Sequence, residues 1–182
     1  MSDQGLACEF LNFQLQSPLV LASGVLGTSA TMLVRIAESG AGMVTAKSCG
    51  PEPRAGHPNP VVVPFDGGLL NAVGLSNPGV SAQVEFLSEA RKGLQPLKVP
   101  LIASMFAGPV AEFAQVAQTL TACEPDLIEL NISCPNVSGG VDFGTDARIC
   151  RRLVEDVRTS IGLPVIAKLT PNVTHITEIA RA

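Results

Sequence analysis

Two aromatic residue types are missing from this chain, which contains neither tryptophan nor tyrosine. Their absence argues against aromatic cages for methylated ligands and against stacking platforms for nucleic-acid bases. A formal net charge of -4 also leaves no basic excess to meet a phosphate backbone. Nucleic acid is therefore not an expected partner.

Long apolar runs are missing as well. No stretch reaches the roughly 18 consecutive apolar residues of a membrane-spanning helix, and the N-terminus MSDQGLACEF lacks the basic and apolar regions of a signal peptide. These absences predict a cytoplasmic protein without a membrane partner. With 46% hydrophobic and 15% charged residues, the chain is expected to bury one sizeable core.

The cysteines form no framework, because they are odd in number and include no CxxC pair. This pattern argues against structural disulfides, a zinc site and an iron-sulfur cluster within this chain. We expect no metal site, reduced thiols, and a packing role for most of them. The five are Cys8, Cys49, Cys123, Cys134 and Cys150.

Five short apolar runs alternate with amphipathic segments. The runs are apolar on both faces, which is typical of parallel strands covered by helices. The segments between them carry apolar residues at helical spacing. The expected strands lie within 18–24, 42–48, 99–105, 126–134 and 163–170, and the expected helices within 29–38, 80–92, 109–122 and 145–160.

This pattern predicts an α/β fold with a repeat of about thirty residues, as in a TIM barrel or a doubly wound sheet. Periodicity alone does not separate these two. Residues 1–17 are expected to form an N-terminal hairpin, and residues 18–182 the first five strand-helix units. The chain stops inside a further amphipathic segment, THITEIARA, so we expect a fragment of a longer protein.

The carboxyl ends of the expected strands are polar, and ligands bind at these ends in parallel α/β folds. Lys47 and Lys168 each end a buried run, where an uncompensated ammonium is costly to desolvate. Two such lysines favour a bound anion or electron-rich ligand. The alternative for each is an ordinary salt bridge to a loop carboxylate.

The fourth run ends in NISCPN, which places two asparagines and a thiol on one loop. Asn131 and Asn136 offer both donors and acceptors, which suits a planar, amide-rich ligand such as a pyrimidine. Cys134 lies between them and is a candidate for reactive chemistry, although a lone cysteine at a strand end is more often a small core residue.

Together these motifs resemble class 1 dihydroorotate dehydrogenase, in order and at the family's spacing. The similar segments cover most of the chain, and NISCPN is the most specific of them. They are ASGVLG (22–27), TAKS (45–48), NAVGLSNPG (71–79), ELNISCPNVSGGVDFG (129–144) and VIAKLTPN (165–172).

The resemblance implies a TIM (β/α)8 barrel that binds FMN at its strand ends and oxidises dihydroorotate to orotate in pyrimidine synthesis. Cys134 would be the base that removes the C5 proton while hydride leaves C6 for the flavin. The implied substrate-binding residues are Lys47, Asn71, Asn131 and Asn136, and the implied cofactor-binding residues are Ala22, Ser23, Gly24, Lys47, Ser48, Asn131 and Lys168.

Within class 1, the segments 71–79 and 137–144 look closer to the NAD-linked subclass. That resemblance implies a second subunit carrying FAD and a [2Fe-2S] cluster, in a homo-oligomer or a heterotetramer. The absence of a cysteine framework and of a dinucleotide-binding turn from this chain is consistent with such a partner.

One segment departs from the family pattern, namely the run PEPRAGHPNPVVVPFDGG before Asn71. Three alternatives therefore stay open: a related FMN enzyme acting on another dihydropyrimidine, an aldolase using Lys168 as Schiff-base nucleophile, and a non-enzymatic truncated barrel. His57 in this segment is expected to be a solvated loop residue, and Gly67-Gly68 a turn.

Overall fold

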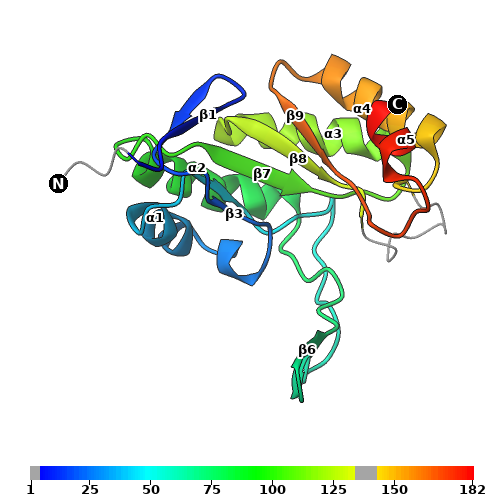
Figure 1. The fold of residues 1–182 in the computed structure, drawn as a ribbon, viewed down its shortest axis with the longest axis horizontal. Coiled ribbons are helices and arrows are strands. Elements are labelled where there is room, and N and C mark those ends of the chain that lie inside the picture. Colours follow the sequence, from blue (N-terminus) through cyan, green and yellow to red (C-terminus); the bar gives the residue numbers. More distant parts are fainter. Residues whose placement is uncertain (1–4, 134–142) are drawn as a thin grey trace.

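The computed structural model of the chain describes residues 5–133 and 143–182. Its centre is a five-stranded parallel sheet whose strands follow one another in chain order (Figure 1). All five lie inside the runs from which buried parallel strands were predicted. They are β3 (Val20–Leu21), β4 (Met43–Thr45), β7 (Leu101–Met105), β8 (Leu127–Asn131) and β9 (Val165–Lys168).

The predicted crossover helices are confirmed, and two of them, α1 and α4, begin at a residue whose side chain caps them. Ser29 accepts a hydrogen bond from the Met32 backbone N–H at the start of α1 (Ala30–Glu38), and Asp146 caps α4 (Ala147–Ser160). Between them lie α2 (Val80–Leu94) and α3 (Val110–Leu120), and α5 (Ile176–Arg181) follows β9. Two short 3-10 helices are η1 (Val25–Gly27) and η2 (Thr121–Cys123).

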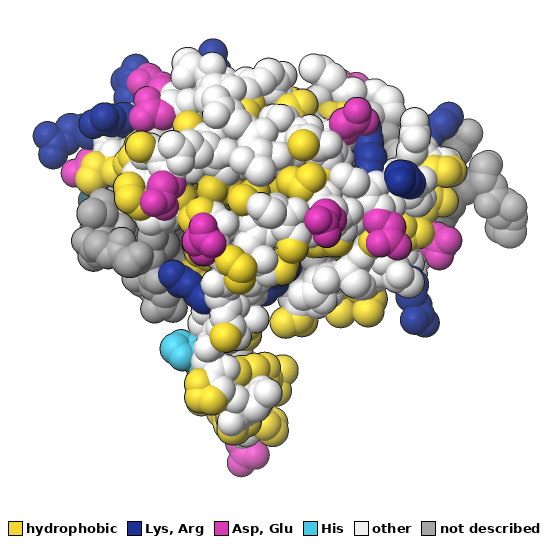
Figure 2. Space-filling view, turned by 180° about the vertical axis from the view of Figure 1, so that it is seen from behind, with side chains coloured by type: hydrophobic (Ala, Val, Ile, Leu, Met, Phe, Trp, Pro, Cys, Tyr) yellow, Lys and Arg dark blue, Asp and Glu magenta, His cyan; other side chains and the backbone are white. Residues whose placement is uncertain are grey.

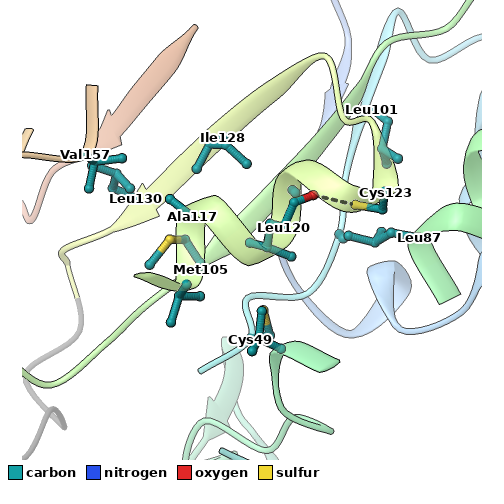
Figure 3. Close-up of a cluster of buried hydrophobic side chains, with 14 of the residues drawn as sticks. Cys49, Leu87, Leu101, Met105, Ala117, Leu120, Cys123, Ile128, Leu130 and Val157 are labelled. Carbon is teal, nitrogen blue, oxygen red and sulfur yellow. Dashed lines mark hydrogen bonds between the residues drawn. The ribbon is translucent and has the colours of Figure 1, made fainter. Parts of the chain in front are cut away.

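Helices α1 to α4 pack against one face of the sheet, where they form the main core. Because side chains alternate along a strand, Leu101, Ala103 and Met105 of β7 point to this face. Figure 3 shows part of this core, in which Leu87 and Leu120 approach the outward side chains of β7 and β8. Burying one such leucine stabilises the fold by about 1.5–3 kcal/mol.

The opposite face carries a small apolar layer at the amino ends of the strands. Strands β1 (Cys8–Phe10) and β2 (Phe13–Leu15) form an antiparallel hairpin. Leu15 of this hairpin packs on Met43, Ile102 and Leu127, which are the first inward-pointing residues of three neighbouring strands. This layer covers the half of the face that lies nearest the amino ends of the strands. The half at the carboxyl ends, on what we call the inner face, carries polar side chains.

A second antiparallel hairpin projects from the body and was not predicted. It consists of β5 (Val62–Phe65) and β6 (Gly68–Asn71), in the segment expected to be a loop (Figure 1). The two-residue connection Asp66-Gly67 contains a glycine at a φ of 100°, a conformation that favours glycine. The turn expected at Gly67-Gly68 lies one residue earlier, at Asp66-Gly67, where it forms the tip of this arm, and Gly68 begins β6.

The strand order resolves the alternative left open by periodicity. A doubly wound sheet reverses its strand order at a switch point and carries helices on both faces. Here the order β3-β4-β7-β8-β9 has no reversal, and α1 to α4 share one face. The architecture is that of part of a (β/α) barrel.

Membrane-crossing helices do not occur in the part of the chain that the structure describes. No helix there combines the length and the hydropathy that a bilayer span requires.

Candidate active site at the strand ends

A hydrogen-bonded row of polar side chains crosses the inner face near the carboxyl ends of the strands. Each of the five strands supplies one member, either within the strand or just after it. Ser23 Oγ lies 3.0 Å from Ser48 Oγ, which lies 2.8 Å from Ser104 Oγ. Ser104 donates to Glu129 at 2.6 Å, and Glu129 forms an ion pair with Lys168 at 3.4 Å.

This row is largely removed from solvent. Ser48, Ser104 and Glu129 are buried, whereas 38% of the Lys168 side chain stays exposed. Buried polar groups are stable only when they are hydrogen-bonded, and no buried side-chain N or O atom among the described residues lacks a partner. The row is thus a satisfied network that ends in a partly exposed ammonium group.

Asn131 joins the network from the end of β8. Its amide Nδ2 donates to Ser48 Oγ at 3.2 Å, and its Oδ1 accepts from Ser133 Oγ at 2.8 Å. Both ends of the amide are therefore fixed, which gives the side chain a single orientation. Alternation along β8 places Asn131 on the same inner face as Glu129.

An open cleft of about 580 Å³ lies beside the network, between the loop after β3 and the arm. Its lining includes Ser23, Gly24 and Lys47 from the barrel, together with Asn71 from the arm. A Cβ atom on Gly24 would meet only the Ala22 carbonyl oxygen, at 3.9 Å, so the backbone here is open to a ligand. Ala22 itself is exposed.

The backbone of Lys47 is held from two sides at the end of β4. Its N–H donates to the Gly27 carbonyl at 2.8 Å, and its carbonyl accepts from Gln83 of α2 at 2.9 Å. A Cβ atom on Gly27 would lie 2.7 Å from the Lys47 backbone nitrogen, so only glycine permits this approach of η1 to β4. The half-buried Lys47 is thereby placed at the cleft.

The arm that carries Asn71 contacts the body mainly through its base. Backbone hydrogen bonds pair Arg54 with Asn77 in both directions, each at 2.9 Å, and join Ala72 to Val61. The Asn77 side chain accepts from the backbone N–H groups of Gly50 and Gly79. These contacts fix the base, while all eight strand residues of the arm are exposed.

Most of the predicted site residues belong to the polar network, to the cleft, or to both. Ser23, Ser48, Asn131 and Lys168 meet in or along the polar network, and Ser23, Gly24, Lys47 and Asn71 share the cleft. Cys134 and Asn136 lie outside the described residues. His57 is an exposed loop residue, as expected, and it also lines the cleft.

Glu129 was missed as a site residue, although its sequence context carries a signal. It interrupts the apolar run DLIELN at a position that shares a strand face with Asn131, and a buried carboxylate almost always has a partner. The salt bridge considered for Lys168 is present, but its carboxylate lies on the neighbouring strand rather than in a loop.

Three buried thiols elsewhere in the chain are expected to be unreactive as nucleophiles at neutral pH. Burial raises the pKa of Cys49 to about 12 and the pKa of Cys123 to about 11. Burial also raises the pKa of Cys150. Figure 3 shows the Cys123 thiol donating to the Leu120 carbonyl oxygen, at 3.0 Å. These three residues are core components and do not contribute to the site.

The described residues contain no group of three or more His, Cys, Asp or Glu side chains able to hold a metal ion. The site instead presents two lysines, a fixed amide and several hydroxyl groups at the end of a parallel sheet. This donor set suits a planar ligand rich in carbonyl and anionic oxygen atoms.

An inner polar layer at the carboxyl ends of parallel barrel strands defines the class, which is that of TIM-barrel enzymes. Residues 5–182 match the sequence profile of the family described as dihydroorotate dehydrogenase. The chain belongs to the dihydroorotate dehydrogenase family.

The similar proteins with curated names point to one branch of that family. A protein of Methanosarcina mazei, named dihydroorotate dehydrogenase B (NAD(+)), catalytic subunit, is 44% identical over 93% of this chain and 54% of its own length. A protein of the same name from Methanocaldococcus jannaschii is 42% identical over the whole chain and 60% of its own length. A third, from Pyrococcus furiosus, is 43% identical over 96% and 56%.

The chain therefore spans between half and two thirds of the length of these relatives.

Proposed function

We propose that the natural protein oxidises dihydroorotate to orotate and is the FMN-binding catalytic subunit of an NAD-linked dihydroorotate dehydrogenase. The observation that carries the proposal is the joining of Ser48, Asn131 and Lys168 in one network beside a cleft lined by Lys47 and Asn71. The family membership and the names of the similar proteins support the same activity.

The donor set fits the ring system of FMN. An isoalloxazine ring presents carbonyl oxygens and ring nitrogens along one edge, and the partly exposed ammonium of Lys168 can donate to these acceptors. Ser23, Gly24, Lys47, Ser48, Asn131 and Lys168 would hold the ring, with Ala22 in the adjoining backbone. When bound, FMN supplies the acceptor for the hydride that leaves the substrate.

The chain's own residues would bind and orient the substrate. Asn71 reaches the cleft from the arm and Lys47 from the barrel, so a molecule between them is held from two sides. Lys47, with Asn71, Asn131 and Asn136, would hold the ring and carboxylate of dihydroorotate. The apolar Val62 and Leu69 line the same cleft and would limit the access of water.

Cys134 is proposed as the base that accepts the C5 proton on its sulfur atom. An ordinary thiol has a pKa of about 8.5, so modest stabilisation by nearby donors gives a usable thiolate near neutral pH. It follows directly after Ser133, whose hydroxyl donates to Asn131. Cys134 is therefore the sequence neighbour of a residue that contacts the network.

The partner proposed for this subunit is a second chain that carries FAD and a [2Fe-2S] cluster, in a heterotetramer or other oligomer of cytoplasmic location. The support lies in the names of the similar proteins, which are called catalytic subunits. Electrons would leave the catalytic subunit through that partner.

The aldolase alternative is disfavoured by the environment of Lys168. A Schiff-base nucleophile must be directed at a carbonyl carbon of the substrate, whereas the Lys168 Nζ lies 3.4 Å from the Glu129 carboxylate.

Turnover with an artificial electron acceptor tests the proposal. The full-length natural protein is mixed with dihydroorotate and a redox dye, and orotate is measured by chromatography. We expect orotate to form with the natural protein and at least about a hundredfold more slowly with Cys134→Ala, the lower range for loss of a general base. Cys8→Ala is the matched control and should be unaffected. Turnover that is unchanged in Cys134→Ala would refute the base assignment, and no orotate from any form would refute the activity.

A further inference from the structure

The side chain of Lys168 leans toward the neighbouring strand. In the register of β8 and β9, Lys168 lies opposite Asn131, and Ile166 lies opposite Glu129. Glu129 is therefore the diagonal neighbour of Lys168, at a separation that only a long side chain can bridge. The ammonium nevertheless reaches the Glu129 carboxylate at 3.4 Å.

The Glu129 carboxylate is fixed by hydroxyl groups whose donor directions follow from a count of protons. An ionised carboxylate can only accept, so Ser104 donates to Glu129 at 2.6 Å. The single hydroxyl proton of Ser104 is then used, and Ser48 must donate to Ser104. By the same count Ser23 donates to Ser48, which also accepts from Asn131.

The hydroxyl groups from three successive strands therefore donate their hydrogen bonds in the same direction, and the last of these bonds ends on the buried Glu129 carboxylate. Hydrogen bonds aligned in this manner polarise one another and strengthen the last bond of the row. Glu129 is thus held in place independently of Lys168, while Lys168 is partly exposed and carries a flexible side chain.

We infer that Glu129 is a positioning residue that holds the Lys168 ammonium at the strand ends, with Ser104 as its support. The ammonium has three N–H donors. One is directed at Glu129, and the other two remain for an acceptor on a ligand. The link from Glu129 to Lys168 rests on these contacts. The link from Lys168 to a flavin rests on the proposed function.

Amine labelling tests the first link without a ligand. Full-length protein freed of flavin is treated at neutral pH with limiting acetic anhydride, and the labelling of each lysine is measured by mass spectrometry. Glu129→Gln keeps the size of the side chain and removes its charge. We expect Lys168 to label roughly fivefold faster in this variant, which corresponds to losing an ion pair of about 1 kcal/mol.

Two further variants make this result specific. Ser104→Ala retains the carboxylate but removes its support, so the labelling of Lys168 should rise by a smaller factor. Glu155→Gln removes an exposed ion pair with Arg151 on α4 and should leave Lys168 unchanged. Equal labelling of Lys168 in the natural protein, Glu129→Gln and Ser104→Ala would overturn the inference.

Binding of FMN tests the second link through a double-mutant cycle. Glu129→Gln should weaken binding roughly fivefold when Lys168 is present, on the same ion-pair energy, and should have no effect in a Lys168→Met background. An equal loss in both backgrounds would mean that Glu129 acts on the fold and not through Lys168. If the natural protein bound no FMN, the proposed function would fail, while the labelling result would still decide the role of Glu129.

Discussion

At the scale of single residues, the thiols divide into buried and accessible groups, and their chemistry should follow this division. Burial raises the pKa of Cys49 to about 12 and of Cys123 to about 11, so neither offers thiolate at neutral pH. In the folded protein iodoacetamide at pH 8 should modify the partly exposed Cys8 but not these two. In denaturant all should react.

The thiol proposed as the base should behave differently. Cys134 is expected to be alkylated faster than Cys8, and dihydroorotate should protect it. Peptide mass spectrometry at successive times measures each rate. Modification of Cys49 or Cys123 at the rate of Cys8 would contradict the burial described here, and a Cys134 slower than Cys8 would contradict its role.

A second residue-scale prediction concerns pH. Asp146 caps α4, and hydrogen bonds from the backbone N–H groups of Ile149 and Arg148 lower its pKa. A lowered pKa contributes stability above the pKa of the unfolded state, and this contribution is lost as the pH falls through the folded-state pKa. Asp146→Asn keeps a capping oxygen but cannot ionise.

The natural protein should therefore be more stable than Asp146→Asn at neutral pH, and the difference should shrink on acidification below the ordinary range of an aspartate. Urea unfolding of both forms at a series of pH values measures it. A difference that stayed constant down to the acid limit would contradict the charged cap.

Most members of the polar network at the candidate site could be predicted from the sequence at this scale, because polar residues that end apolar strands are visible in the sequence. Ser48, Asn131 and Lys168 were found in this way and meet in one network. Glu129 was not, because the strand that contains it was read as uniformly apolar. The pairing of Glu129 with Lys168 depends on which strands are neighbours, and a single sequence does not give that.

At the scale of elements, one ion pair joins a helix to two strands. The Arg91 side chain of α2 contacts Asp126 at 2.6 Å, and the same carboxylate oxygen accepts from the Leu101 backbone N–H at 2.8 Å. Asp126→Ala would leave a guanidinium and a backbone donor without their partner. We expect a loss of about 2 kcal/mol in the free energy of unfolding.

Chemical denaturation of the full-length protein measures this loss. Glu155→Ala, which breaks an exposed pair on α4, is the control and should change stability much less. Equal effects of the two substitutions would show that the contacts of Asp126 contribute no more to the free energy of unfolding than an exposed ion pair does.

The arm formed by β5 and β6 is the element that the sequence pattern did not predict. Its signal was present, since Asp66-Gly67 between two β-prone runs is a strong hairpin marker. The run was nevertheless expected to be a loop. Figure 2 shows hydrophobic side chains gathered on the projecting arm, and Val62, Val63, Phe65, Leu69 and Leu70 are all exposed.

Removal of the arm should separate the binding of FMN from the binding of orotate. If residues 62–71 are replaced by a short glycine-serine turn, the barrel body should fold and keep FMN, because the arm contacts the body mainly at its base. Binding of orotate should weaken at least tenfold, because Asn71 is lost. The visible flavin spectrum, recorded during a titration with orotate, measures both the retention of FMN and the affinity for orotate. Loss of the flavin would contradict this division, and unchanged orotate binding would remove Asn71 from the site.

At the scale of the whole molecule, five buried runs with helical segments between them were sufficient to predict an α/β fold with five strand-helix units. They could not distinguish a barrel from a doubly wound sheet, because both have the same local periodicity. The order of the strands and the position of α1 to α4 on one face made the distinction. Both features depend on contacts between residues that are far apart in the sequence, and no local pattern contains this information.

The central claim is that the polar layer at the strand ends binds a flavin and presents dihydroorotate to it. The measurement that tests it most directly is the visible absorption spectrum of the full-length natural protein, before and after anaerobic addition of dihydroorotate. We predict a flavin band that bleaches on addition. A protein without a flavin band, or a flavin band that dihydroorotate leaves unchanged, would contradict the claim.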